Sequence, residues 1–187
     1  MFGKLFQKRE KRPTGSQDET IGSASVGDVF TVSGFGLEYE ESYFIIEKKN
    51  RYAGSSAEWF EVLGVDDDKR LWVEWSGAGD RSVSVRADAR PVGLDSVGVT
   101  TDELIRMDEK HSIDSYIDSQ GTRYQYENSG EASYFEDDMG EGAGFYLWEF
   151  ASDDGARILS VVKWDDMPFQ IYISEVVSAD RLSVYKR

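Results

Sequence analysis

Short runs of β-branched and aromatic residues, separated by acidic or glycine-containing turns, recur along most of this chain. Two of them show the pattern most fully: WFEVLGVDDDKRLWVEW covers residues 59–75, and WEFASDDGARILSVVKW covers residues 148–164. Aspartate and glycine tolerate the backbone angles of tight turns, and aromatic residues form favourable cross-strand pairs. Each run therefore predicts a β-hairpin that turns at DDDK or DDGA and is closed by aromatic side chains.

The two halves of the chain resemble each other. The tripeptide SYF occurs at residues 42–44 and again at 133–135, and an aromatic run with glutamate follows each copy. A register that pairs residues 59–62 with 147–150 matches glutamate with glutamate and apolar with apolar residues, which keeps each strand face consistent. The spacing of the runs is typical of antiparallel meanders, and their similarity predicts an internal duplication.

One stretch between the halves has a different pattern. In TTDELIRMDEK, Thr100 precedes Glu103 by three residues, which is the signature of a capping box at a helix N-terminus. The sequence predicts one short helix over residues 101–109.

These patterns predict an all-β protein of two similar small antiparallel modules, barrel-like or curved sheets, that lie side by side and are joined by the short helix. The expected divisions are a basic amphipathic tail and linker at 1–20, a first β module at 21–95, a connector at 96–110 and a second β module at 111–187.

Charge and composition exclude several classes of function. The net charge is −15, although the first twelve residues carry five basic side chains and one acidic one. An acidic body repels phosphate backbones, so we expect no nucleic-acid partner. Cysteine is absent, which excludes disulfides and thiolate metal sites. No apolar run approaches a membrane span and the start is too polar for a secretory signal, so we expect a cytoplasmic protein.

The segment VGDVFTVSGFGLEYEESYFIIEKKNRY, followed by EWFEVLGVDDDKRLWVEW, resembles a bacterial domain-of-unknown-function family of aromatic-rich all-β proteins. The second half, with FYLWEF and LSVVKW, is similar to that family's C-terminal portion, so the resemblance covers about residues 26–184. Genes of the family often lie near those for spermidine-synthase-like enzymes and phage-shock-type membrane-stress proteins. The resemblance implies an accessory role and no catalytic residue.

The N-terminal segment MFGKLFQKREKR predicts contact with a membrane surface. Its apolar residues share one face of a helix and basic residues border that face, so the segment suits anionic lipid at the inner membrane. The alternatives are a disordered tail or a cover for a strand edge. The predicted lipid contacts are Phe2, Lys4, Leu5, Phe6, Lys8 and Arg9.

Trp72 and Glu74 form a candidate site for a cationic ligand. Both alternate with Leu71, Val73 and Trp75, so they lie on the opposite face of their strand. A ring beside a carboxylate attracts ammonium groups, such as those of a polyamine or a Lys/Arg-rich peptide. The alternative is that the other half of the chain covers Trp72.

Catalysis has less support. His111 is the only histidine, and it follows a charged helix end without the motifs of a serine hydrolase. Acidic turns such as residues 66–68 and 136–138 favour Ca²⁺ or Mg²⁺ only if several converge, and none has EF-hand spacing. We therefore assign no catalytic residue, no metal ligand and no cofactor.

The function predicted from the sequence is that of a non-enzymatic accessory or adaptor protein with an unidentified protein partner, peripheral at the inner membrane through weak contact with anionic lipid. The first alternative is a binding module for a small cationic ligand. The second alternative is a metal-dependent hydrolase that uses the acidic turns.

Overall fold

The computed structural model describes residues 20–55, 57–77, 79, 82–112 and 114–187. Within them the strands are β1 (Val29–Val32), β2 (Phe44–Gly54), β3 (Glu58–Asp66), β4 (Lys69–Ser76), β5 (Ser82–Ala87), β6 (Tyr116–Ser119), β7 (Thr122–Phe135), β8 (Ala143–Ser152), β9 (Arg157–Trp164), β10 (Gln170–Ser178) and β11 (Leu182–Tyr185). The helical elements are α1 (Thr101–Lys110) and four 3-10 turns, η1 (Ile21–Ser23), η2 (Leu94–Val97), η3 (Glu136–Asp138) and η4 (Ala179–Arg181).

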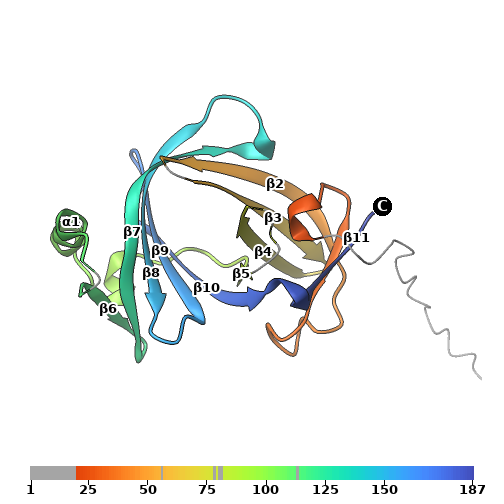
Figure 1. Cartoon of the computed structure of the whole chain (residues 1–187), viewed down its shortest axis with the longest axis horizontal. Coiled ribbons are helices and arrows are strands. Elements are labelled where there is room, and N and C mark those ends of the chain that lie inside the picture. The colour runs from red at the N-terminus through yellow and green to blue at the C-terminus, as the bar shows by residue number, and fades with distance from the viewer. Residues whose placement is uncertain (1–19, 56, 78, 80–81, 113) are drawn as a thin grey trace, which may run out of the picture.

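Eight of the strands close into one antiparallel barrel (Figure 1). Neighbours follow the order β2-β3-β4-β5-β10-β9-β8-β7, and β7 pairs back to β2 to complete the ring. The closing ladder joins residues 51–54 of β2 to residues 132–135 of β7. Because each half of the chain supplies four strands to the same ring, the predicted arrangement of two modules side by side is wrong.

Unpaired strand edges explain why the halves combine. A four-stranded meander standing alone leaves backbone N–H and C=O groups unpaired along both edges. Here β5 pairs with β10, and β2 pairs with β7, so each meander covers the edges of the other. The segments 21–95 and 111–187 are therefore two walls of one barrel.

Three further strands extend the sheet beyond the ring. β1 pairs with the start of β2 and with β11, and β6 pairs with the start of β7. β2 and β7 are long because each forms two ladders along the same edge. The start of β2 pairs with β1 and the start of β7 pairs with β6, and the far ends of β2 and β7 pair with each other.

Both predicted hairpins are confirmed. β3 and β4 turn between Asp66 and Lys69, and Phe60 stacks on Trp75 across the ladder with ring centroids 5.9 Å apart. β8 and β9 turn after residue 152, and Phe145 lies opposite Trp164 with centroids 4.7 Å apart. Aromatic pairs close each hairpin at the end opposite its turn, as the sequence pattern indicates.

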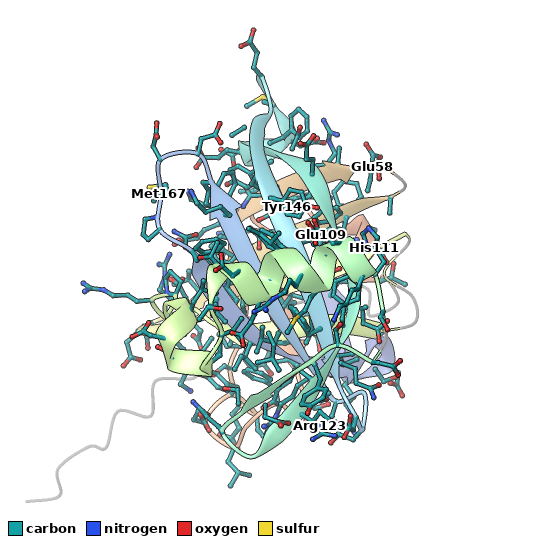
Figure 2. The ribbon with its side chains drawn as sticks, turned by 90° about the vertical axis from the view of Figure 1, so that its left-hand side faces the viewer. Glu58, Glu109, His111, Arg123, Tyr146 and Met167 are labelled. Carbon is teal, nitrogen blue, oxygen red and sulfur yellow. The ribbon has the colours of Figure 1, made fainter. Side chains whose placement is uncertain are left out.

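The predicted helix is present and its capping box is complete. The side chain of Thr100 accepts from the backbone N–H of Glu103, whose carboxylate accepts from the backbone N–H of Thr100. The helix does not join two modules: Figure 2 shows it lying across the outer face of the barrel strands. It ends at Lys110, and the residue that caps it, His111, adopts a left-handed backbone conformation.

Two apolar clusters lie on the outside of the barrel wall. Leu71, Val73 and Trp75 of β4 pack with residues of β1 and β11 in the first cluster. In the second, Leu159 and Val161 of β9 pack with residues of η2 and α1. Because side chains alternate along a strand, the residues between them point to the other face, into the barrel.

Candidate functional site: a carboxyl-lined cavity in the barrel

The barrel interior contains a cavity of about 500 Å³. All eight barrel strands contribute to its lining. Glu74, Ser84, Leu147 and Glu149 line it from the face opposite the apolar clusters, which is the inner face of the sheet. The cavity lies within the range of about 300–1,000 Å³ that is usual for small-molecule sites. A second hollow of about 50 Å³ shares Trp59, Glu74, Leu147 and Glu149 with it.

Glu61 lies behind this lining and has several partners. The residue as a whole is only 4% exposed. It accepts hydrogen bonds from Asn50 Nδ2 at 3.0 Å and from the Tyr52 hydroxyl at 2.7 Å, and it forms an ion pair with Arg86 at 3.4 Å. Burial raises the pKa of the Tyr52 phenol, which therefore stays protonated as a donor. The Glu61 carboxyl thus has two hydrogen-bond donors and a cation of its own.

Glu74 lies directly opposite Glu61 on the β3–β4 ladder and faces the cavity. Among the described residues no hydrogen-bond donor reaches its carboxyl. Burial raises the pKa of Glu74 to about 8, the negative charges of Glu149 and Glu61 add to the shift, and the positive charge of Arg86 offsets a smaller part of it. Glu74 is therefore an acid that keeps its proton near neutral pH as long as the cavity lacks a cation.

Glu149 brings a second carboxyl to the cavity from β8. Asn128 Nδ2 donates to its Oε2 atom at 2.9 Å. Burial raises the pKa of Glu149, and the hydrogen bond from Asn128 offsets only part of that shift. The Asn128–Glu149 pair lies on neighbouring strands in the same manner as Asn50–Glu61.

Arg86 of β5 is the single cation among the described residues that line the cavity and its side hollow. Its guanidinium bonds to Glu61 and lies 5.2 Å from the ring centre of Trp72 and 4.7 Å from that of Tyr172. The guanidinium of Arg86 thus contacts the Glu61 carboxyl and the faces of two aromatic rings. Among the described residues neither Glu74 nor Glu149 forms an ion pair, although the charge of Arg86 acts on Glu74 from a distance.

An aromatic wall borders the carboxyls. Trp59 and Tyr52 stack with centroids 5.2 Å apart and planes only 3° apart. Phe145 meets the Tyr52 ring edge-on at 5.9 Å, and Tyr134 lies 5.2 Å from it. Aromatic faces next to carboxylates attract organic cations.

The profile of a family described as a domain of unknown function, DUF4178, matches residues 33–179. The chain belongs to the DUF4178 family. The match includes every strand of the barrel, from β2 to β10, and so includes all the carboxyls of the cavity. No curated protein and no solved structure gives a significant match to the chain.

In this DUF4178 chain the two residues of the predicted cationic-ligand site have different surroundings. Glu74 faces the cavity. Trp72 is already engaged, because its Nε1 donates to Asp88 at 2.9 Å and Arg86 lies over its ring. Trp59 is the tryptophan that shares the cavity with Glu74.

The residues predicted to contact lipid, between Phe2 and Arg9, lie outside the described residues, so that contact stays a prediction. None of the helices in the described part of the chain is both long and apolar enough to cross a bilayer.

The acidic turns do not gather into a metal site. Among the described residues there is no group of three or more metal-ligating side chains. Glu136 and Asp138 of η3 instead form ion pairs with Lys48 and Arg51 of β2. Asp154 caps its own turn by accepting from Ser152 and from the backbone of residue 156.

His111 belongs to a hydrogen-bonded cluster under α1 (Figure 2). Its Nδ1 atom lies 2.9 Å from the Tyr126 hydroxyl, which lies 2.7 Å from Ser129 Oγ. Ser129 and the Tyr146 hydroxyl both donate to Asp108 of α1. The cluster holds α1 against β7 and β8, and Ser129 also borders the cavity of the DUF4178 barrel.

Trp59, Arg86 and Glu149 are site residues that were not predicted from the sequence. A signal for Glu149 was present, because the register that pairs residues 59–62 with 147–150 places Glu61 and Glu149 at matching positions. Arg86 lies opposite Trp72 on β5, and its long side chain reaches across β4 to Glu61 of β3, a diagonal contact that strand alternation alone does not predict.

Proposed function

We propose that the barrel of this chain is a non-enzymatic binding module for a small organic cation. The main support for the proposal is the position of Glu74, which faces the cavity together with Glu149. Arg86, the one cation among the described residues of the cavity and its side hollow, lies in the side hollow and is paired with Glu61. A buried carboxyl without a counter-charge is unfavourable as an anion. A ligand cation supplies that counter-charge.

The aromatic wall favours an organic cation over a metal ion. Trp59 and Leu147 offer apolar and π surface beside the carboxyls, whereas a divalent metal needs several oxygen ligands at short range. An ammonium or guanidinium group on an apolar stem matches this lining. Polyamines and Lys/Arg-rich peptides are the two ligand classes that combine such groups with apolar stems.

The accessory role fits this ligand chemistry. The resemblance noted from the sequence places genes of such proteins near spermidine-synthase-like enzymes and membrane-stress proteins, which supports a link to polyamines or to a partner at the inner membrane. A protein that recognises a cation without transforming it acts as an adaptor or sensor.

Titration of the full chain with spermidine at pH 8.5, followed by tryptophan fluorescence and calorimetry, tests the proposal. We expect Glu74→Gln and Glu149→Gln each to weaken binding by about ten-fold or more, because each removes one carboxylate from the cation. Glu109→Gln is the matched control, since Glu109 is exposed on α1 outside the barrel. Equal binding by all four proteins, or no binding at millimolar spermidine and lysine peptides, rejects the proposal.

A further inference from the structure

The wall of the barrel has a gap on one edge of β7. The ladder with β2 ends at the pair Gly54–Ala132. On the same edge, the pairing toward β6 ends where the backbone N–H of Tyr126 donates to Ser115. Among the described residues, the stretch 127–131 of β7 therefore has no strand partner on this edge.

The alternation of the ladders shows which backbone groups face the gap. The backbone N–H of Gly54 donates to the carbonyl of Ala57, just before β3. Because backbone groups alternate between the two edges of a strand, those of the preceding residue, Ala53, point to β7, where Ser133 lies opposite. Every second residue of β7 points the same way, which places the N–H and C=O groups of Ser129 and Glu131 at the gap. A strand edge of this kind accepts an extended peptide.

The gap opens onto the carboxyl-lined cavity. Residues 128–132 all line the cavity, and Glu131 is exposed at its rim. Gly130 shares the inward face with Asn128, whose amide reaches Glu149. A Cβ atom on Gly130 would meet no atom within 4 Å, so the wall is open at this position.

We propose that the cation is a lysine side chain, presented by an extended segment of a partner protein that pairs with Ser129 and Glu131 across this gap. The inference rests on the proposed function, because it uses the same carboxyls. In an antiparallel pair, a residue opposite Gly130 points its side chain to the same face as Gly130, which is the barrel interior. Its two neighbours lie opposite Ser129 and Glu131, and their backbone groups complete the ladder.

Charge favours such a partner. The chain carries a net charge of −15, and Glu131 stands at the rim of the gap. A basic segment is therefore attracted before it docks, and its lysine then reaches the carboxyls of Glu74 and Glu149.

The test compares acetyl-Ala-Lys-Ala-amide with butylammonium by calorimetry on the full chain at pH 8.5. The tripeptide is expected to bind about ten-fold or more tightly, because it adds two backbone pairings to the same ammonium group. N-methylation of either alanine removes that gain, whereas N-methylation of the lysine, whose N–H points away from β7, leaves it.

Two variants localise the effect. Gly130→Leu is expected to abolish binding of both probes by filling the entrance. Gly144→Leu is the control, since Gly144 is exposed on β8 and a Cβ there also meets no atom within 4 Å. Unchanged binding by Gly130→Leu overturns the inference.

The outcomes separate this inference from the proposed function. Equal affinity for the tripeptide and butylammonium, both lost in Glu74→Gln, overturns the peptide pairing and leaves the cation site intact. Binding of neither probe, nor of spermidine, rejects the cation site and the inference with it. A gain in tripeptide affinity on deletion of residues 1–12 would assign the gap to the chain's own basic segment and overturn the partner.

Discussion

Glu74 lies directly across the β3–β4 ladder from Glu61, and the two carboxyls have opposite surroundings. Glu61 receives two hydrogen bonds and the guanidinium of Arg86. Among the described residues, Glu74 receives none of these and faces the cavity. Like charges on directly opposed strand positions repel, and the raised pKa of Glu74 relieves that repulsion because the Glu74 carboxyl keeps its proton near neutral pH.

The first prediction concerns stability against pH. Because the pKa of Glu74 is raised to about 8 in the folded chain, the stability that its proton provides is complete below about pH 4.5 and is lost as the pH rises through 8. The variant Glu74→Gln has no carboxyl to ionise at this position, so its stability does not fall in this way as the pH rises. At pH 8.5 the variant is expected to exceed the wild type in free energy of unfolding by an amount on the order of 3 kcal/mol. Urea titrations at pH 5 and pH 8.5 measure the difference, and an equal gap at both values would contradict the assignment.

The second prediction concerns the pH dependence of ligand affinity. A cation that pairs with Glu74 must displace its proton below pH 8. The affinity for spermidine is therefore expected to rise with pH from 6 to about 8, by at most about ten-fold per unit, and then to level off. Calorimetry in two buffers of different ionisation enthalpy would also detect the released proton. A flat profile in the wild type would be incompatible with a protonated Glu74.

The third prediction concerns Arg86. Arg86→Met leaves Glu61 buried without its cation, which is expected to reduce stability by about 3 kcal/mol. Arg123→Met is the control, because Arg123 also lies over a tyrosine ring and pairs with an aspartate, but at the surface. Thermal unfolding should show a large drop for the first variant and little change for the second. Similar midpoints would argue that the Arg86 pair is unimportant.

The fourth prediction concerns close packing in the first apolar cluster. A Cβ atom on Gly64 would come within 2.3 Å of the Phe30 ring and 2.7 Å of Phe44. Gly64→Ala is expected to destabilise the chain by about 1–3 kcal/mol through overpacking. A Cβ atom on Gly130 meets no atom within 4 Å, so Gly130→Ala should leave the unfolding midpoint nearly unchanged. Chemical denaturation of the two variants makes the comparison, and equal stabilities would show that the Phe30 ring yields without cost.

Local patterns in the sequence were enough to predict much of the secondary structure. The acidic turns predict both hairpins, Thr100 and Glu103 predict the start of α1, and alternation along β4 places Glu74 on the face opposite Leu71 and Val73. Each of these features depends on residues only a few positions apart. The composition and periodicity of the strands likewise indicate an antiparallel all-β chain.

Only the tertiary structure decided that the two meanders form one barrel. A strand that closes on its own meander and one that closes on the other half have the same alternation of side chains, so the sequence pattern is identical for both. The choice depends on long-range ladders such as Ala53 with Ser133 and Val85 with Glu175. Closure of these ladders makes the polar face an interior and brings Glu149 of β8 to the group that Glu61, Glu74 and Arg86 form on β3, β4 and β5. It thereby creates a cavity that no local stretch of the chain encodes.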